Sequence, residues 1–391
     1  MKRPILTTMI ALAPVAVAAQ VAQGPANAEY EPAFPEQTRA PALPETAVQA
    51  ETFVDGLVRP WGIVPLPDGA ILVTERPGRL RMIGADGALS DPIAGLPEIA
   101  AVDQGGLLDV TVADDFAQTR RVWFTYAKPM DGGYVTAAAT ALLSDDATTL
   151  TEVEDIFVQE PVSPVAMHFG SRIVIDGTYA WITTGEHFAF FQRDKAQDIS
   201  TTFGKVIRVT RDGAVPEDNP MVDEGGIDTI WSLGHRNIQG AALHPDTGAL
   251  WTIEHGPAGG DELNVPEAGL NYGWPVVSYG LTYGGAPIGS GLPRAPEYEE
   301  PVYYWDPVIA PGGMAFYDGE LFEDWQGNLL ISSLAPGGLV RLTLESGLVT
   351  GEERLVPDAG RIRDVEVLDD GSVLLLVDAE DGAILRVTPA E

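Results

Sequence analysis

The sequence predicts an all-β protein folded as a six-bladed β-propeller, and three observations support this prediction. Helical periodicity is nearly absent along the chain. Short runs rich in Val, Ile, Leu, Thr and Trp alternate with turn residues, as is typical of β-strands. These runs repeat weakly from about residue 52 onward, and six such units over about 340 residues are typical of a propeller. A large β-sandwich or a pair of barrels is the alternative, because short strands alone do not distinguish these folds.

Each repeat consists of a turn that ends in glycine, a β-rich run, a second turn and another β-rich run. The paired runs are 70–74 with 79–83, 179–184 with 205–210, 328–332 with 339–343, and 372–377 with 384–388. A fifth unit begins at the Thr247-Gly248 turn, and a sixth, within residues 107–143, has a longer turn. Because a propeller closes a ring, loops from every blade meet on one face around the central channel. Residues distant in sequence are therefore expected to share one site.

The N-terminal region is predicted to be an export signal followed by a leader. Residues 1–28 have two basic residues, an apolar stretch and the small-x-small site Ala26-Asn27-Ala28, so cleavage is expected after Ala28. Cleavage after Ala18 is the alternative. Residues 29–51 form an extended Pro-rich leader, and residues 52–391 form the propeller. No other segment reaches roughly 18 unbroken apolar residues, which predicts a periplasmic or secreted protein without membrane insertion.

Composition limits the function classes further. A hydrophobic content of 45% is enough for a large core, and the 43 glycines and 31 prolines are dispersed, as expected for many short strands and turns. The formal net charge is −34, without a basic cluster. Nucleic acids and anionic membrane surfaces are therefore not expected as partners, because both require clustered Lys and Arg. The chain has no cysteine, so an exported form relies on packing, with or without a bound metal, instead of disulfides.

Polar residues recur at equivalent points of successive units, just before or at the first β-rich run. These residues are Gln104, His168, Arg236 with Asn237, and Arg361 with Arg363. In a propeller, residues at such a position project into one shared space. Guanidinium groups there can bind the carboxylates of a polyanion, and His168 is suited to proton transfer near neutral pH. Any one of them alone is more often structural, so the prediction depends on their coincidence. His187 has no clear assignment.

The stretch EHGPAGGDELN suggests a cation site at the end of a β-rich run. It presents the carbonyls of Gly256 and Pro257 and then the carboxylates of Asp261 and Glu262. Oxygen-rich loops with permissive glycines suit calcium, although ordinary turns have the same composition. His255 is expected to be a neighbour of this loop and not a ligand, because calcium prefers oxygen. The inserted segment 271–305, rich in Tyr and Gly, is predicted to overhang the channel mouth.

Several enzyme classes lose support because their motifs are missing from the sequence. The chain contains no GxxxxGK[ST], HExxH or GxSxG motif and no cysteine nucleophile. No dinucleotide-binding glycine fingerprint follows a predicted strand. P-loop, zincin and nucleophile-elbow chemistries are therefore not expected.

An ordered set of motifs resembles one known family. The motifs are RPWGIVPLPDGAILVTERPGRL, DQGGLLDV, HFGSRIVIDG, GKVIRVTRDGAVPEDNP, SLGHRNIQGAALHP, EHGPAGGDELN, NYGWPVVSYG and RIRDV, between about residues 52 and 388. Together they resemble the soluble pyrroloquinoline quinone (PQQ) dependent glucose/sorbosone dehydrogenases, and most closely the bacterial aldose sugar dehydrogenases. The resemblance implies a six-bladed propeller with PQQ in the channel mouth. It also implies oxidation of aldoses at C1 to lactones, with electrons passed to an external acceptor such as a cytochrome, a quinone or a dye.

The resemblance also implies a role for each matching residue. His168 corresponds to the base that takes the proton from the anomeric hydroxyl. Arg236 with Asn237 would bind the cofactor near its reacting carbonyl, and the remaining cofactor contacts would be Gln104, Tyr283, Arg361 and Arg363. The carbonyls of Gly256 and Pro257 would ligate a calcium ion that also binds PQQ. Glu262 and the backbone carbonyl of Tyr272 would ligate a second, structural calcium.

Two departures from the family pattern leave alternatives open. Many relatives have a lysine that binds the cofactor near residues 334–336, where this chain has Ala335 and Pro336. Some relatives have Asp before the catalytic histidine, where this chain has Met167. The missing lysine leaves a non-enzymatic binding propeller as one alternative function, and a calcium-dependent propeller lactonase or hydrolase is the other. The arginines favour the dehydrogenase, because a metal-dependent hydrolase does not need several guanidiniums to hold a polycarboxylate.

Overall fold

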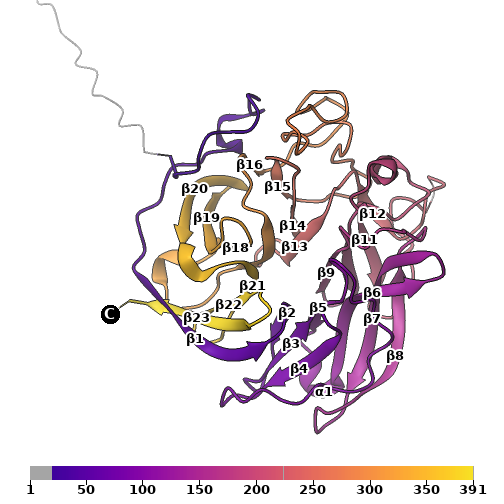
Figure 1. Ribbon diagram of the computed structural model, residues 1–391, viewed down its shortest axis with the longest axis vertical. Coiled ribbons are helices and arrows are strands. Elements are labelled where there is room, and N and C mark those ends of the chain that lie inside the picture. Colours follow the sequence, from indigo (N-terminus) through magenta and orange to yellow (C-terminus); the bar gives the residue numbers. More distant parts are fainter. Residues whose placement is uncertain (1–19, 223, 391) are drawn as a thin grey trace, which may run out of the picture.

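The computed structural model describes residues 20–222 and 224–390, and six β-sheets form a ring in it. Figure 1 shows the sheets arranged radially around one axis, as the predicted six-bladed β-propeller requires. The described residues contain one short α-helix, α1 (Phe116–Thr119), and four 3-10 helices. The latter are η1 (Pro35–Gln37), η2 (Phe190–Gln197), η3 (Glu323–Trp325) and η4 (Pro357–Ala359). The all-β prediction is confirmed.

The blades follow one another along the chain. The first three comprise β2 (Pro60–Pro65), β3 (Ile71–Glu75) and β4 (Arg79–Ile83); β5 (Leu107–Val112), β6 (Arg121–Met130), β7 (Gly133–Leu143) and β8 (Leu150–Val158); and β9 (Gly170–Ile175), β10 (Tyr179–Thr184), β11 (Lys205–Thr210) and β12 (Ile230–Leu233). The next two comprise β13 (Ile238–Leu243), β14 (Leu250–Glu254), β15 (Asp261–Asn264) and β16 (Tyr303–Trp305); and β17 (Pro311–Phe316), β18 (Leu329–Ser333), β19 (Leu339–Glu345) and β20 (Leu348–Leu355). The first blade has three strands, one fewer than each of the other blades.

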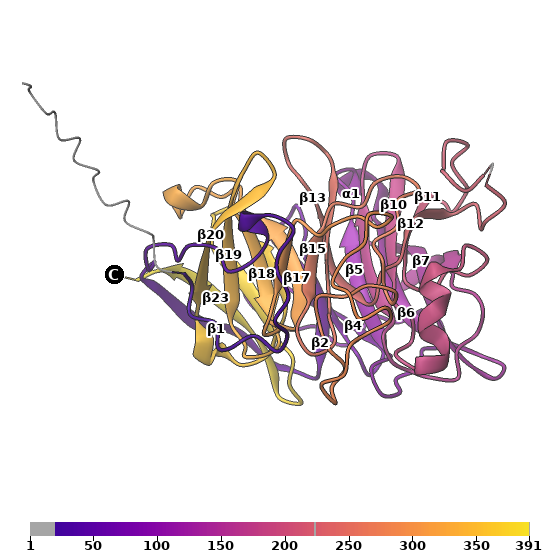
Figure 2. The same cartoon turned by 90° about the horizontal axis from the view of Figure 1, so that it is seen from above.

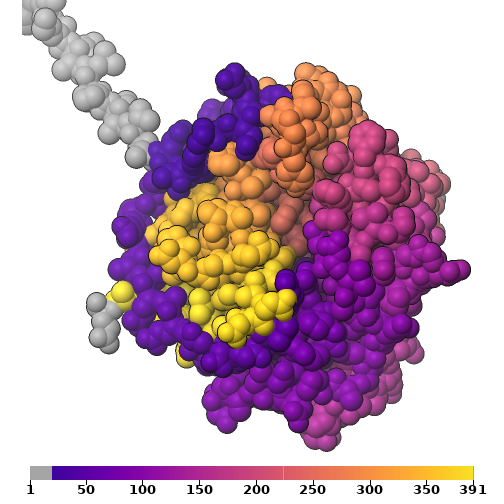
Figure 3. Space-filling model, viewed as in Figure 1, coloured from indigo at the N-terminus to yellow at the C-terminus, as the bar shows by residue number. Residues whose placement is uncertain are grey.

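The sixth blade is built from both ends of the chain. It contains β21 (Ile362–Val367), β22 (Val373–Val377), β23 (Gly382–Pro389) and the N-terminal strand β1 (Val48–Leu57). Strand β1 pairs antiparallel with β23, from Val48 opposite Pro389 to Leu57 opposite Gly382. In Figure 3 the indigo N-terminal residues accordingly lie beside the yellow C-terminal ones. Strand β1 begins four residues before the predicted start of the propeller at residue 52, because this pairing orders the end of the leader.

The innermost strands share a burial pattern and an irregularity that together shape the channel. Strands β2, β5, β9, β13 and β21 each have four buried residues followed by two partly buried ones. In each of the six blades the register shifts between the inner strand and the next one, as at a β-bulge. A bulge redirects side chains, and these bulges lie at the same end of every blade. Figure 2, which views the ring from its edge, shows the strands running side by side across it.

The hydrophobic core lies between neighbouring blades. One cluster joins Leu72 and Leu80 of the first blade to Val110 and Phe124 of the second, and similar clusters join the other neighbours. Both faces of each sheet are thus covered, which explains strand runs with little polar alternation. The observed strands match the predicted runs to within two or three residues at each end.

The segment before β1 runs along the outside of the fourth and fifth blades. The Asp306 carboxylate accepts hydrogen bonds from the backbone N–H groups of Asn27 and Ala28, each at 2.9 Å. Gln37 is buried, and its amide donates to the Pro301 carbonyl at 3.0 Å. The apolar part of the predicted signal peptide lies outside the described residues. Among the residues that are described, no helix is long and apolar enough to cross a membrane.

Candidate active site

A cavity of about 520 Å³ lies where the bulged ends of the inner strands meet. The sequence-predicted residues that line it are Gln104, His168, Asn237, Tyr283, Arg361 and Arg363. Trp61, Gln239, Arg59, Arg76 and Asp378 also line it. Four lining residues are arginines and one is a carboxylate, in a chain whose formal net charge is −34. The cavity is therefore a locally cationic site in an acidic protein.

His168 and Glu186 form a buried pair at one side of this cavity. His168 lies two residues before the inner strand β9, and Glu186 lies two residues after β10 of the same blade. The two side chains meet with 2.7 Å between His168 Nδ1 and Glu186 Oε2. The same Glu186 oxygen accepts the backbone N–H of Phe188 at 2.9 Å. Because a carboxylate accepts the Nδ1 proton, the neutral ring keeps Nε2 free as a proton acceptor.

The electrostatics of this pair favour a neutral histidine and an ionised carboxylate. Burial lowers the pKa of His168 below its ordinary value, while Glu186 acts in the opposite direction. Burial alone would raise the pKa of Glu186, but His168 and the nearby Arg236 lower it to about 2. The second Glu186 oxygen, Oε1, is buried without a hydrogen-bond partner among the described residues. The pair is thus ready to take up a proton at neutral pH.

Gln104 and the local backbone hold His168 in place. The His168 backbone N–H donates to Gln104 Oε1 at 2.9 Å, so Gln104 positions the histidine as well as lining the cavity. His168 has a positive φ of 47°, an uncommon conformation for a residue with a side chain. Its carbonyl lies so close to Gly185 that a Cβ at that position would collide with it. The glycine is therefore required for the histidine to reach Glu186.

Arg361 and Arg363 share one wall of the cavity with Asp378. Arg363 donates from Nη2 to Asp378 Oδ2 at 3.1 Å, and Arg361 lies 3.6 Å from the same oxygen. Burial, with the charges of Arg361 and Arg76, lowers the pKa of Arg363 to about 10 although Asp378 opposes this. The Asp378 carboxylate is thus shared by the guanidinium groups of Arg361 and Arg363.

Arg76 is a lining residue that the sequence did not single out. It is partly buried, and burial lowers its pKa despite Asp378 nearby. Its Nε is buried without a hydrogen-bond partner among the described residues, as is Nε of Arg363. Arg59, next to it, forms an exposed ion pair with Glu380 at 2.7 Å. This wall can therefore accept additional negative charge.

Arg236 lies beside the cavity and not in its wall. Its Nη1 donates to the carbonyls of His255 and Gly256, each at 2.7 Å. Its guanidinium lies 5.2 Å from the centroid of the Trp274 ring, and Nη2 is 3.5 Å from the Tyr283 hydroxyl. Tyr283 comes from the inserted segment, which thus reaches the mouth as predicted. The neighbouring Asn237 is in the wall, where its Oδ1 accepts the Gly170 N–H at 3.0 Å.

The residues predicted to bind a cofactor-linked calcium are near the cavity but do not line it. The Gly256 carbonyl faces Arg236, as described above. The Gly256 N–H donates to Asp261 Oδ1 at 2.7 Å, and Pro257 follows in the same loop. His255 does line the cavity, and its Nε2 is 2.6 Å from the Pro311 carbonyl. The described residues contain no group of three or more His, Cys, Asp or Glu side chains arranged to hold a metal.

Glu262 and Tyr272, predicted to ligate a structural calcium, both lie next to Glu254. Glu262 is opposite Glu254 in the pairing of β14 with β15. Burial and the Glu254 charge raise the pKa of Glu262 well above its ordinary value. The Tyr272 ring stacks on His235 at 4.7 Å, and His235 Nδ1 is 2.9 Å from Glu254 Oε1. A buried carboxylate, Glu254, and a partly buried one, Glu262, therefore lie opposite each other on neighbouring strands, an arrangement that favours binding of a cation.

Sequence reasoning missed Glu186, Arg76, Trp61 and Asp378. Glu186 follows a strand in TTGEHF, where nothing distinguishes it from the other acidic residues of the chain. Arg76 is part of a turn, and Trp61 resembles an ordinary core residue. One signal could have identified Glu186 from the sequence. It lies two residues after a predicted strand in the same repeat as His168. His187, which the sequence left unassigned, is buried, and its ring nitrogens lie 3.0 Å from the Val165 carbonyl and 2.7 Å from Gln159 Oε1.

Comparison with known proteins agrees with this fold and cavity. The sequence matches the Glucose / Sorbosone dehydrogenase family over residues 57–386. It is 42% identical over 354 residues to aldose sugar dehydrogenase YliI of Escherichia coli (strain K12), covering 89% of this chain and 94% of that protein. The crystal structure of the soluble E. coli aldose sugar dehydrogenase in the apo-form matches with a TM-score of 0.84 at 41% identity, over 88% of this chain and 100% of that one. The PQQ-bound aldose sugar dehydrogenase of Streptomyces coelicolor matches with a TM-score of 0.72 at 25% identity, over 88% and 99% of the two chains.

The propeller and its cationic cavity with a histidine–carboxylate pair define a sugar dehydrogenase. The chain belongs to the glucose/sorbosone dehydrogenase family. The resemblance predicted from the ordered motifs is therefore confirmed.

Proposed function

We propose that this enzyme binds PQQ in the cavity and oxidises aldoses at C1 to lactones. The observation that carries the proposal is one cavity that is lined both by His168, which pairs with Glu186, and by four arginines with one carboxylate among them. The PQQ-bound relative from Streptomyces coelicolor supports the choice of cofactor.

The residues of the wall fit the carboxylates of PQQ. Arg76 and Arg363 each have a buried Nε without a partner among the described residues. Arg361 makes two long contacts, to the Leu334 carbonyl at 3.4 Å and to Asp378 at 3.6 Å. Guanidiniums that lack close partners in a buried site favour an anionic ligand, because the anion restores the hydrogen bonds lost to water. The volume of about 520 Å³ is also within the range of roughly 300–1,000 Å³ usual for ligand sites. Arg76 and Arg59 supply positive charge on this wall, although Ala335 replaces the lysine of many relatives.

His168 is proposed as the base that accepts the proton of the anomeric hydroxyl at Nε2. Glu186 holds the opposite nitrogen and stabilises the imidazolium that results. PQQ, when bound, supplies the acceptor for the hydride that leaves C1. Arg236, Asn237 and Gln104 would orient the reacting groups, and Tyr283 would contact the cofactor from the mouth.

Two calcium sites complete the proposal. The carbonyls of Gly256 and Pro257 would ligate an ion whose role is to polarise the cofactor. In this site the Gly256 oxygen also accepts Arg236, so the two cations need anionic cofactor oxygens near them. Glu262 and the Tyr272 carbonyl, with Glu254 close by, would ligate the structural ion.

Export and electron transfer follow as further parts of the proposal. The N-terminal sequence supports an exported enzyme, in the periplasm or outside the cell, with a small-molecule aldose as substrate. The reduced cofactor would pass its electrons to an external acceptor.

The proposal is tested by reconstitution of purified protein with PQQ and Ca²⁺. We expect quinone absorbance to remain after desalting and a redox dye to be reduced when glucose or other aldoses are added. A protein that retains no quinone and reduces no dye with any aldose would contradict the proposal. Retention of quinone without dye reduction would support a binding propeller, and hydrolysis of lactones without PQQ would support the hydrolase alternative.

A further inference from the structure

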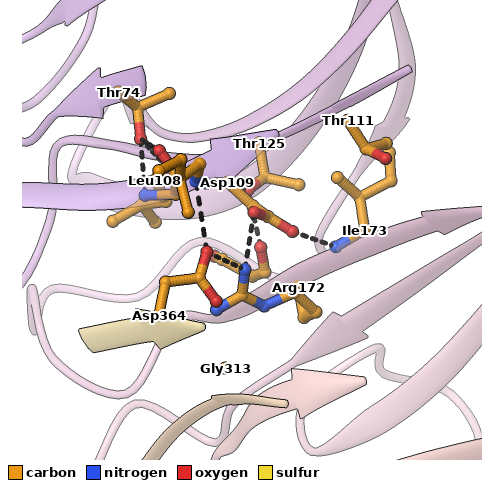
Figure 4. Close-up of polar contacts among 12 residues, drawn as sticks. Thr74, Leu108, Asp109, Thr111, Thr125, Arg172, Ile173, Gly313 and Asp364 are labelled. Atoms are coloured by element: carbon orange, nitrogen blue, oxygen red, sulfur yellow. Dashed lines mark hydrogen bonds and ion pairs between the residues drawn. The ribbon is translucent and has the colours of Figure 1, made fainter. Parts of the chain in front are cut away.

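The floor of the cavity rests on a buried ionic cluster that closes the channel. Figure 4 shows the Arg172 guanidinium between two carboxylates, Asp109 and Asp364. Arg172 Nη1 donates to Asp109 Oδ1 at 2.8 Å and to Asp364 Oδ2 at 2.9 Å. The three residues are only 6%, 2% and 2% exposed. On the other side of the cluster, a second cavity of about 290 Å³ occupies the opposite end of the channel.

This cluster connects the inner strands of all six blades. Arg172 belongs to β9, Asp109 to β5 and Asp364 to β21. The carboxylates also accept backbone N–H groups, Asp109 from Ile173 at 2.8 Å and Asp364 from Ile63 of β2 at 3.1 Å. Two contacts reach the remaining inner strands. Arg172 Nε donates to the Gln239 carbonyl of β13 at 3.2 Å. Asp364 packs so closely on Gly313 of β17 that a Cβ at this glycine would collide with it.

Two routes lead from Arg172 to the arginine wall of the cavity. The first is Trp61, whose ring lies 4.7 Å from the Arg172 guanidinium and 5.7 Å from that of Arg363. The second is Gln239, whose backbone carbonyl accepts Arg172 and whose side-chain Oε1 accepts Arg363 Nη1 at 2.8 Å. The amide of the same side chain donates to the Gly170 carbonyl at 3.0 Å. Arg172 therefore contacts both Trp61 and Gln239, the two residues that support Arg363 on the side of the buried cluster.

We propose that Arg172 is a positioning residue for the cofactor: it holds Trp61 and Gln239, and through them Arg363, in the geometry that binds PQQ. This inference rests on the proposed function. A purely stabilising role does not explain the arrangement, because buried ion pairs commonly contribute little net stability compared with apolar replacements. An arginine is needed because one planar group must donate from Nε, donate twice from Nη1 and stack on an indole.

The test is a neutral version of the cluster, Arg172→Met with Asp109→Asn and Asp364→Asn. The two asparagines keep oxygens that can accept the Ile173 and Ile63 N–H groups, and the three charges of the cluster are removed together. We expect the variant to fold and to bind PQQ about 10- to 100-fold more weakly, by analogy with the loss of metal affinity when residues that orient metal ligands are replaced. Binding is measured by titrating the apoprotein with PQQ in the presence of Ca²⁺ and without sugar. The single variant Arg172→Lys should also bind PQQ more weakly, since an ammonium cannot make all these contacts.

The matched control is another buried ion pair on a tryptophan, Arg341 with Glu353. Arg341 Nη2 lies 2.7 Å from Glu353 Oε2, and the guanidinium is 5.4 Å from the Trp325 ring centroid. The pair is as buried as the cluster but belongs to β19 and β20 of the fifth blade and does not line the cavity. Arg341→Met with Glu353→Gln should change the melting temperature and leave the PQQ dissociation constant unchanged.

A neutral cluster with wild-type PQQ affinity would overturn the inference while the proposed function stood. If the triple variant did not fold, the same comparison would be made with Arg172→Lys, where wild-type affinity would again overturn it. If the wild type bound no PQQ, the proposed function would fail. The inference would then be decided by the crystal structure of the triple variant, which should lose the Arg363–Gln239 hydrogen bond. Unchanged positions of Trp61 and Arg363 in that structure would refute it.

Discussion

Replacing Glu186 with glutamine isolates the electrostatic part of the proposed proton transfer. The Glu186 oxygen that faces His168 also accepts the Phe188 N–H. The glutamine carbonyl should therefore take the same place and keep the Nδ1–H of His168 as its donor. The ring orientation and tautomer are then preserved, and only the negative charge is removed. Any loss of activity reports how much that charge stabilises the imidazolium.

The expected loss follows from the geometry of the pair. Two charges about 4 Å apart at an effective dielectric constant of about 20 interact by about 4 kcal/mol, which sets an upper limit of roughly a thousandfold in rate. The smaller difference between a charge-assisted and a neutral hydrogen bond, about 1 to 1.5 kcal/mol, sets a lower limit of roughly tenfold. Arg236, which is close enough to lower the pKa of Glu186, offsets part of the attraction. We expect kcat to fall about 100-fold.

The pH dependence of kcat/KM for Glu186→Gln provides an independent test of the pair. Glu186 raises the pKa of His168 against the effect of burial, so its replacement should lower that pKa further. Because the base works in its neutral form, the acid limb of kcat/KM should move to lower pH. The assay is dye reduction with saturating PQQ and Ca²⁺ between about pH 4 and 8, with PQQ affinity measured separately as the control. A kcat within threefold of wild type, with an unmoved acid limb, would refute the pairing as the source of catalysis.

Three further perturbations address the base, the arginine wall and the structural ion. His168→Gln should retain PQQ binding and lose at least about 100-fold in kcat, the usual scale for removing a general base; turnover close to wild type would transfer that role to another group. Arg76→Met should weaken PQQ binding by at least about tenfold in a titration without sugar, because the site loses a guanidinium whose buried Nε has no partner among the described residues. Arg59→Met is the control and should have less effect, because Arg59 is exposed and already paired with Glu380. EDTA should lower the melting temperature of the wild type, since an ion bound at a hundredfold excess over its dissociation constant contributes about 2.7 kcal/mol. Glu262→Ala should melt near the chelated value without EDTA; identical melting of wild type, chelated protein and variant would remove the structural ion from the proposal.

The sequence predicted the repeated elements well because each is determined by local chemistry. Runs such as 339–343 are rich in β-formers and end at turn residues, so the observed strand β19 begins at the predicted residue. The ordered motifs then gave the family. The position of Gln104, His168 and Asn237 around one cavity followed from their recurrence at one point of the repeat.

The remaining features depend on contacts between residues far apart in the chain. Strand β1 begins at Val48 only because β23, at the other end of the chain, pairs with it. Glu186 became recognisable only when His168 Nδ1 was found 2.7 Å away. Arg76 belongs to a turn in its own blade, and its importance comes from the arginines that the sixth blade brings next to it. No composition or periodicity of a local segment contains that information.

Closure of the ring by β1 and β23 has a consequence for when the site can form. The sixth blade carries Arg363 and Asp364 on β21 and Arg361 just before it, so both the arginine wall and the buried cluster around Arg172 depend on this blade. That blade lacks its edge strand until the two ends of the chain meet, and such a distant pairing carries a large loop-closure entropy. A chain that crosses a membrane from its N-terminus exposes its last strand only at the end of translocation. For the exported enzyme proposed above, the cofactor pocket would therefore be completed last, and PQQ would bind after the chain has crossed the membrane.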